Sequence, residues 1–464
     1  MIGAGAAGLS VANVAARLGL RVTLIEQDRM GGECLNTGCV PSKALLACAH
    51  AVGAARDAGR YGVRLPAPEI EWSGVRAHVR GAIAALALAD SEERYRGLGC
   101  EVLRAPARLA APDAVEVEGR RIAARRIVLA VGSRPLIPDL PGLDGVPFLT
   151  NETVFDLDER PGHLVILGAG AMGVEMAQAF ALLGSRVTLL ARARVLPGVD
   201  AELAAGLRDA LASAGVEVRE GVEAVAAAPG PTLLLRGGER VTGTRLLLAT
   251  GRRPTLNALG LSAAGVEATP RGIATDRGLR SLSNHRVWAV GDCADPEGLG
   301  PQRYTHVASQ HAGVVVRRAL FGLPARLSYA ALPRAVFTDP ELGWVGLTET
   351  EAQASGRACT VLRWPLAETD RAVAEGRTAG LAKLVVDRRG RVLGGGALAP
   401  GAGEMLGAIG VLIGRRGGAR RLADLVVAYP TRFEAFKRAA GSLYTPRLFA
   451  PGPKRAARVL SRLL

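Results

Sequence analysis

The sequence lacks the residues that several classes of protein depend on. Six cysteines in 464 residues are too few for a disulfide-stapled secreted fold. Lysine occurs at only four positions, so the net charge of +15 rests on arginine. An arginine excess of this kind also follows from genomic base composition and is weak evidence for a partner. There is no helix-turn-helix pattern, zinc-finger spacing or basic motif with interleaved aromatics, which predicts that nucleic acid is not a partner.

Long uncharged apolar runs are also missing. The best candidate, residues 392–413, contains Glu404 and many glycines, so we expect no stable membrane insertion. The opening segment is apolar but has no basic region before it, so it does not predict a signal peptide. A hydrophobic content of 49% predicts a compact protein, and the length predicts two to four domains. The expected location is cytoplasmic.

The chain contains the glycine pattern G-x-G-x-x-G twice. In this pattern the first glycine permits a sharp turn, the second lets the backbone approach a pyrophosphate, and the third lets helix pack on strand. A helical stretch follows each copy, and then a second strand, at residues 21–25 and 186–190. The apolar run 163–167 predicts the strand that leads into the second copy. We therefore predict two dinucleotide sites, on the glycine sets Gly3, Gly5, Gly8 and Gly168, Gly170, Gly173.

The residue that ends each second strand indicates which nucleotide is bound. Glu26 stands 18 positions after Gly8, the place for a carboxylate that accepts from ribose hydroxyls, which favours the adenosine of FAD. The same offset from Gly173 reaches Ala191, followed by Arg192 and Arg194. Two guanidinium groups without a carboxylate favour a 2′-phosphate, so we predict NADPH in preference to NADH. The alternative is that these arginines merely belong to an arginine-rich chain.

The first glycine motif has little chain before it. Only Met1 and Ile2 precede Gly3, whereas a dinucleotide fold needs roughly four to six further strand residues there. We expect either a start codon assigned too late, which we favour, or a shortened chain. Protein made from this start is expected to bind FAD poorly, and equal flavin content in an extended form would contradict this.

Two cysteines follow the first dinucleotide unit in a glycine-bearing, polar setting. Cys34 and Cys39 are five positions apart where a helix is expected to begin, so they can close a small disulfide ring. A helix N-terminus lowers the pKa of a thiol and favours the thiolate that redox exchange requires. Incidental buried thiols or half of a metal site are the alternatives for such a spacing alone. The preceding glycines and the following Pro-Ser-Lys43 favour a redox-active pair, and we predict no metal site.

Together these motifs resemble the class I pyridine nucleotide-disulfide oxidoreductases, which include dihydrolipoamide dehydrogenase, glutathione reductase and mercuric reductase. Further segments carry the resemblance almost from end to end: 129–135 with Gly132, 249–254 with Gly251, 287–292 with Asp292, and 337–341. The resemblance implies an α/β fold with two Rossmann-like dinucleotide-binding domains, for FAD and NAD(P), plus a C-terminal mixed α/β dimerisation domain. The expected boundaries are 1–147 with 272–325 for FAD, 148–271 for NAD(P), 326–450 for dimerisation and 451–464 for a basic tail.

The resemblance also implies roles for individual residues. Cys34 would be the interchange thiol that meets the substrate, and Cys39 the charge-transfer thiolate against the flavin. Lys43 and Glu175 would pair beside the flavin ring, although Glu175 alone would be taken for a helix-surface carboxylate. Asp292 would hold the ribitol hydroxyls of FAD.

The chain departs from the disulfide-reducing members where they carry His-Pro-Thr followed by a glutamate. Here Glu434 is kept, but Tyr429 replaces the histidine, and His311 is the last histidine in the chain. A phenol, with an ordinary pKa near ~10, is a poor proton shuttle at neutral pH. Mercuric reductase is similar in having a tyrosine here, and Tyr95 lies close to the place of its second active-site tyrosine, unless Tyr95 is a partly buried helix residue. No cysteine follows Cys359, so the C-terminal cysteine pair of mercuric reductase is missing.

Three functions therefore compete. The favoured one is NADPH-dependent reduction of a thiol-reactive small molecule or metal ion by a symmetric homodimer, in which Tyr429 and Glu434 face the cysteines of the other subunit. The second is a dihydrolipoyl dehydrogenase or another disulfide reductase. The third is a non-catalytic flavin-bearing interaction protein, which the intact Cys34, Cys39, Lys43 and Glu175 count against.

Overall fold

The computed structural model describes residues 1–463, which form two compact units. The first comprises residues 1–168, 182–190 and 223–328, and the second comprises 169–181, 191–222 and 329–464. Within the described range no helix is long and apolar enough to cross a membrane. The predicted α/β class is confirmed.

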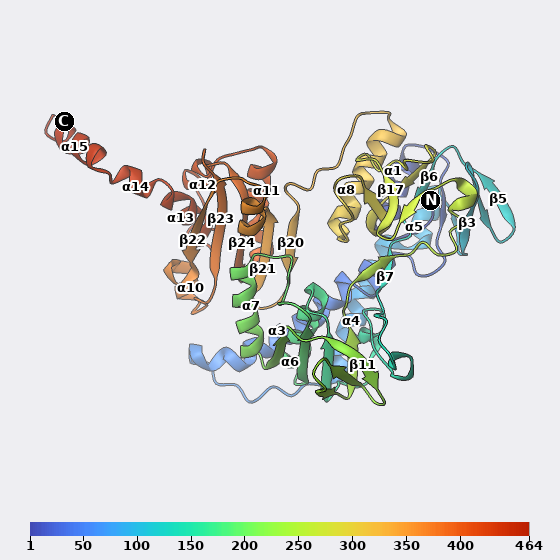
Figure 1. Cartoon of the computed structure of the whole chain (residues 1–464), viewed down its shortest axis with the longest axis horizontal. Helices are drawn as coiled ribbons and strands as arrows, with labels where there is room; N and C mark the ends of the chain where they lie inside the picture. The colour runs from blue at the N-terminus through green and yellow to red at the C-terminus, as the bar shows by residue number, and fades with distance from the viewer. Residues whose placement is uncertain (464) are drawn as a thin grey trace. The chain divides into compact units, whose positions relative to one another are not determined.

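The first unit is built on parallel strands that carry the first glycine motif (Figure 1). Strand β1 (Thr23–Ile25) pairs with β2 (Glu101–Leu103), and β6 (Ile127–Leu129) pairs with β18 (Val287–Ala289). Ile2 joins the two pairs, because it bridges both Ile25 and Leu129. The apolar face of helix α1 (Ala6–Arg17) is buried and packs against α8 (Thr305–Val315). Ile2 therefore occupies the place of the central strand that the glycine motif predicts before Gly3.

The amino group at the start of the chain is buried at this position. The amino group of Met1 donates to Thr23 O over 2.9 Å, and burial lowers its pKa to about 6. Ile2 N donates to Val128 O, and Ala130 N donates to Ile2 O. Met1 and Ile2 thus make the hydrogen bonds of a central strand, although they are too few to count as one.

The remaining elements of the first unit form smaller layers. Parallel strands β8 (His163–Leu167), β9 (Arg186–Ala191) and β14 (Arg245–Leu248) stand in the order β9-β8-β14. The unit also contains antiparallel ribbons: β3 (Ala107–Ala111), β4 (Ala114–Val117) and β5 (Arg120–Ala123); β11 (Ala224–Ala228), β12 (Thr232–Leu235) and β13 (Arg240–Thr242); and β7 (Ser133–Pro135) with β15 (Arg252–Pro254). A further small sheet has the order β16 (Ala268–Thr269), β17 (Gly272–Thr275), β19 (Ala294–Pro296). Helices α2 (Gly32–Asn36), α3 (Cys39–Asp57), α4 (Trp72–Ala87) and α5 (Glu92–Gly97) follow the first dinucleotide turn.

The second unit contains a five-stranded antiparallel sheet with the order β20-β21-β24-β23-β22. Its strands are β20 (Pro333–Val336), β21 (Glu341–Gly346), β22 (Cys359–Pro365), β23 (Leu381–Asp387) and β24 (Val392–Ala399). Helix α11 (Ala402–Gly414) packs on β21 and β24, and α13 (Glu434–Ser442) packs on β22 and β23. An added Cβ at Gly396 would lie 2.2 Å from Trp344, so only glycine leaves room for this buried indole.

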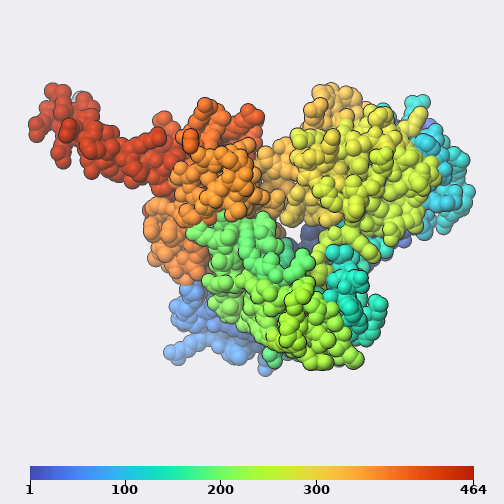
Figure 2. All heavy atoms as spheres, viewed as in Figure 1, coloured from blue at the N-terminus to red at the C-terminus, as the bar shows by residue number. Residues whose placement is uncertain are grey.

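The C-terminal segment extends beyond the packed part of the second unit. Helices α14 (Thr445–Leu448) and α15 (Pro451–Leu460) follow α13, and the end of the chain is drawn as a narrow arm (Figure 2). No residue of α14 or α15 is buried. The predicted basic tail is thus a helix over most of its length.

Candidate active site

The first glycine motif forms a cradle that leaves no room for side chains. Gly3 has a φ of +100°, and an added Cβ would lie 2.3 Å from Ala130 O. At Gly8 an added Cβ would lie 2.0 Å from Gly3 O. At Gly5, by contrast, the nearest atom would be 3.8 Å away, so the space beside its backbone is open. This is the arrangement that a pyrophosphate needs in order to approach a helix N-terminus.

A cavity of about 530 Å³ opens on this cradle. Its walls include Gly3, Gly5, Glu26, Glu33 and Gly132. Glu26 is held at the end of β1, because Oε2 accepts from Ala4 N over 2.6 Å and Oε1 accepts from Asp28 N. An anchored carboxylate beside a glycine turn suits the ribose and pyrophosphate of a dinucleotide, so these residues fit FAD.

The two cysteines lie together as free thiols near the start of α3. Cys34 is half-buried in α2, whereas Cys39 is exposed and is the first residue of α3. The hydrogen bond between the two sulfurs and the burial of Cys34 raise the Cys34 pKa well above its ordinary value. The Cys34 thiol therefore keeps its proton near pH 7. Cys39 stands at the N-terminus of α3, a position that favours a thiolate.

Thr305 is a neighbour of the cysteines that the sequence did not indicate. Its Oγ1 lies 3.3 Å from Cys39 Sγ, and it begins helix α8. The hydroxyl can donate to the Cys39 thiolate. The two residues are 266 positions apart, so no local motif links them.

A polar network connects the residue before Cys34 to the second flavin motif. Glu33 pairs with Arg252, and Asn151 Nδ2 donates to Glu33 Oε1 over 3.0 Å. Arg252 Nε donates to Ser133 Oγ over 2.8 Å, and Ser133 in turn bonds the Asp292 carboxylate. Burial raises the pKa of Glu33 to about 7 even though Arg252 lowers it. Glu33 and Arg252 thus belong to the candidate site, although neither residue was predicted from the sequence.

His311 holds the turn that precedes Asp292. It is fully buried, and Gly291 N donates to its Nδ1 over 3.0 Å. Burial lowers the pKa of His311 to about 4, so the ring is neutral and can accept this bond. The sequence had indicated His311 only as the last histidine, and the structure gives it a positioning role.

The first glycine of the second motif, like Gly3, has no space for a side chain. Gly168 has a φ of +113°, and an added Cβ would lie 2.3 Å from Ala249 O. Gly170 and Gly173 lie at the start of α6 (Ala171–Leu182), where Val174 N donates to Gly170 O. Gly251, with a φ of +130°, precedes β15.

The two arginines after β9 differ in what they contact. Arg192 is exposed and has no ion pair among the described residues. Arg194 Nη2 donates to the carbonyls of Pro197 and Val199, whereas its Nη1 is buried without a partner within residues 1–463. Both guanidinium groups therefore have donors left for an anion.

Lys43 and Glu175 lie in different units, so their pairing stays a prediction. Lys43 Nζ lies 3.4 Å from Ser42 Oγ on helix α3. Glu175 is buried in α6, and its carboxylate accepts from Phe337 N over 3.0 Å. A buried carboxylate is thus present at position 175, rather than the helix-surface residue that the motif alone would suggest.

Tyr429 and Glu434 make different contacts in the second unit. Tyr429 is 71% exposed, and its hydroxyl donates to Asp370 Oδ2 over 2.7 Å, which raises the tyrosine pKa. Glu434 Oε1 accepts from Arg438, and its Oε2 is buried without a partner among the described residues. This buried oxygen therefore has an unused capacity to accept a hydrogen bond.

Tyr95 is a core residue. It is 3% exposed, packs with Leu9 and Leu24, and donates to Leu9 O over 3.1 Å. Burial raises its pKa to about 12. The buried-helix alternative for Tyr95 is therefore the one that the structure supports.

These features define a dinucleotide-binding protein with a redox cysteine pair next to its first nucleotide turn. Residues 1–312 match the model of the pyridine nucleotide-disulphide oxidoreductase family, and residues 332–440 match its dimerisation domain. The chain belongs to the pyridine nucleotide-disulphide oxidoreductases and is a class I flavoprotein disulfide oxidoreductase. Members of this family bind FAD and use NAD(P)H. The dimerisation domain supports a homodimer.

Several relatives cover nearly the whole chain. Mercuric reductase of Streptomyces lividans is 35% identical, over 95% of this chain and 94% of its own. Dihydrolipoyl dehydrogenase 3 of Pseudomonas aeruginosa is 34% identical, over 95% and 96%. Among solved structures, LpdA from Mycobacterium tuberculosis superimposes with a TM-score of 0.85 at 28% identity, and the HOCl-induced flavoprotein disulfide reductase RclA from Escherichia coli with 0.83 at 27%, each over 95% of this chain and 98% of that one.

Proposed function

We propose that the protein is an NADPH-dependent, mercuric reductase-like flavoenzyme whose Cys34–Cys39 pair reduces a thiol-reactive acceptor such as a soft metal ion. The observation that carries the proposal is the phenol of Tyr429 where disulfide reductases need an imidazole. Its pKa is raised further by Asp370, so it is a poor proton donor to a leaving thiolate near pH 7. A soft metal ion bound between thiolates needs no such proton. The similarity to mercuric reductases supports the same acceptor class.

The electrons balance without a further reactant. NADPH is oxidised to NADP⁺, and its two electrons reduce the acceptor, for example Hg(II) to Hg(0). FAD, when bound, supplies the hydride acceptor between the nicotinamide and the sulfurs. Cys39 holds the thiolate, and Cys34 carries the proton that leaves when a metal ion binds there. The Arg192 guanidinium, exposed and without an ion pair among the described residues, provides the contact for the 2′-phosphate.

The test is steady-state oxidation of NADPH by the FAD-loaded protein with Hg(II), lipoamide or glutathione disulfide as acceptor. We expect Hg(II) to support turnover and both disulfides to be at least ~100-fold poorer, because they need general acid catalysis. Cys34→Ala and Cys39→Ala should abolish the reaction, whereas Cys48→Ala, which lies with Cys39 on α3, should leave it unchanged. Fast reduction of lipoamide with NAD(H) would instead identify a dihydrolipoyl dehydrogenase. Failure of all three acceptors would contradict both functions.

Arg192→Ala tests the nucleotide preference. Loss of one phosphate contact should raise the KM for NADPH by ~10- to 100-fold and leave the KM for NADH unchanged. Arg240→Ala, an exposed arginine on β13, is the matched control. Equal effects on both nucleotides would contradict a 2′-phosphate role for Arg192.

A further inference from the structure

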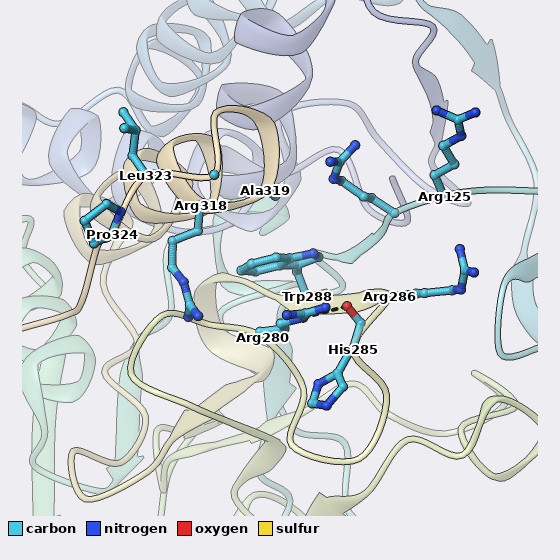
Figure 3. Close-up of a pocket in the computed structure, with 11 residues that line it drawn as sticks. Arg125, Arg280, His285, Arg286, Trp288, Arg318, Ala319, Leu323 and Pro324 are labelled. Carbon is cyan, nitrogen blue, oxygen red and sulfur yellow. Dashed lines mark hydrogen bonds between the residues drawn. The ribbon is translucent and has the colours of Figure 1, made fainter.

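A second cavity in the first unit has no role in the proposed function. It measures about 880 Å³, and five of its eleven lining residues are arginines: Arg125, Arg126, Arg280, Arg286 and Arg318. Lysine and arginine together make up only 58 of the 464 residues, so the composition of the whole chain does not account for this concentration. These residues come from three separate stretches of sequence that the fold brings together around Trp288 (Figure 3).

The positive charge in this cavity is only partly neutralised. Arg318 pairs with Asp276 over 2.7 Å, and Arg280 Nε donates to His285 O over 2.6 Å. Arg125, Arg126 and Arg286 are exposed and have no ion pair among the described residues. Guanidinium groups that line one cavity without counter-charges raise its positive potential, and an anion bound there is stabilised by that potential.

The cavity lies at the amino ends of strands whose carboxyl ends reach the flavin cradle. Arg126 precedes β6 and Arg286 precedes β18, and these two strands are parallel. The flavin-side residues Gly132 and Asp292 follow the carboxyl ends of the same strands. Each of these strands has three residues, so its two ends are ~10 Å apart. No residue lines both cavities. The arginine cavity is therefore a separate site.

The surroundings of Trp288 indicate which part of a ligand is recognised. The ring is 5% exposed, and the guanidinium carbons of Arg280 and Arg318 lie 5.8 Å and 5.5 Å from its centroid. Both guanidinium groups lie over the indole ring (Figure 3), so little of the face of the ring is left for a nucleobase to stack on. The accessible groups are guanidinium donors, which match phosphate oxygens.

We propose that this cavity binds a linear chain of phosphate groups, such as tripolyphosphate or the triphosphate of a nucleotide, without recognising a base. The volume exceeds what one phosphate fills, and the three exposed arginines supply separate contacts along a chain. The binding is electrostatic, so it weakens as salt is raised.

Isothermal titration calorimetry on the FAD-loaded protein tests this with tripolyphosphate, ATP and AMP at low and moderate salt. Tripolyphosphate and ATP should bind within about threefold of each other, and AMP at least ~tenfold more weakly. The variant Arg125→Ala/Arg126→Ala/Arg286→Ala should lose at least ~tenfold in tripolyphosphate affinity. These side chains make no hydrogen bond or ion pair among the described residues, so flavin content and melting temperature should be unchanged.

The matched control, Arg17→Ala/Arg21→Ala/Arg64→Ala, removes the same charge from exposed positions of the same unit and should keep its affinity within about twofold. Equal losses in the two triple variants would show a non-specific charge effect and overturn the proposal. So would ATP or a single-stranded oligonucleotide that binds while tripolyphosphate does not. None of these readouts depends on the electron acceptor, so failure here is distinguishable from failure of the proposed reductase activity.

Discussion

Glu33 should make the stability of the protein depend on pH near neutrality. Its carboxyl has a pKa of about 7 in the folded protein, against an ordinary 4.5, because burial disfavours the ionised form more than Arg252 favours it. Because the pKa is higher in the folded than in the unfolded protein, the protonated carboxyl of Glu33 stabilises the folded state relative to the ionised one, and this contribution is fully present below pH 4.5. It is lost progressively as the pH rises towards 7.

The magnitude follows from the shift. The difference between 4.5 and about 7 corresponds to at most ~3.4 kcal/mol. Because the Glu33 side chain is 33% exposed, solvent screening reduces this, and we expect ~2 kcal/mol. Glu33→Gln removes the titration while keeping an amide that can still accept from Asn151 and Arg252.

The assay is urea unfolding of the FAD-loaded protein at pH 5 and pH 8. Between these values the wild-type free energy of unfolding should fall by ~2 kcal/mol more than that of Glu33→Gln. Glu93→Gln, an exposed carboxylate on α5, should follow the wild type. Parallel pH dependences for wild type and Glu33→Gln, within ~0.5 kcal/mol, would refute a protonated Glu33 at neutral pH.

Further substitutions test the cradle and the second unit. Gly3→Ala should prevent stable folding of the first unit, because its Cβ would meet Ala130 O at 2.3 Å. Gly5→Ala should fold, because its Cβ enters open space, but it should retain less flavin on gel filtration, because that space belongs to the cradle. Normal flavin content in Gly5→Ala would contradict the pyrophosphate position. Lys383→Met should lower the free energy of unfolding by ~3–5 kcal/mol in urea, because it leaves Asp200 as a buried carboxylate 2.9 Å from where the ammonium was. Lys437→Met should change it by less than ~1 kcal/mol, and equal losses would rule out the buried ion pair as the cause.

Features carried by adjacent residues were predictable from the sequence. Gly3 and Gly168 have positive φ angles and no space for a Cβ, which is why only glycine serves at both turns. The α/β class and the family follow from such local signals, because each motif carries its own backbone requirement. The domain boundaries and the roles of individual site residues stay predictions.

Contacts between distant parts of the chain were not predictable. Glu33 and Arg252 are 219 positions apart, and Cys39 and Thr305 are 266 apart. Arg252 lies inside the segment 249–254, but nothing in the sequence assigns a role to its side chain, and threonine at a helix start is ordinary. Only the fold brings Arg252 to Glu33 and Thr305 to Cys39.

The pKa values at the site bear on the missing histidine. At position 429 the Asp370 carboxylate raises the pKa of the phenol above its ordinary value, so the phenol is a poor proton shuttle near pH 7. Glu33, next to Cys34 in the chain, has a pKa of about 7 instead, in the range where an imidazole titrates. Tyr429→His should place an imidazole within electrostatic reach of Glu434, whose charge acts on residue 429 and whose buried Oε2 has no partner among residues 1–463. Disulfide reduction should then rise by ~10-fold or more while NADPH-dependent flavin reduction is unchanged. No gain with lipoamide or glutathione disulfide would show that the identity of residue 429 does not set the acceptor class.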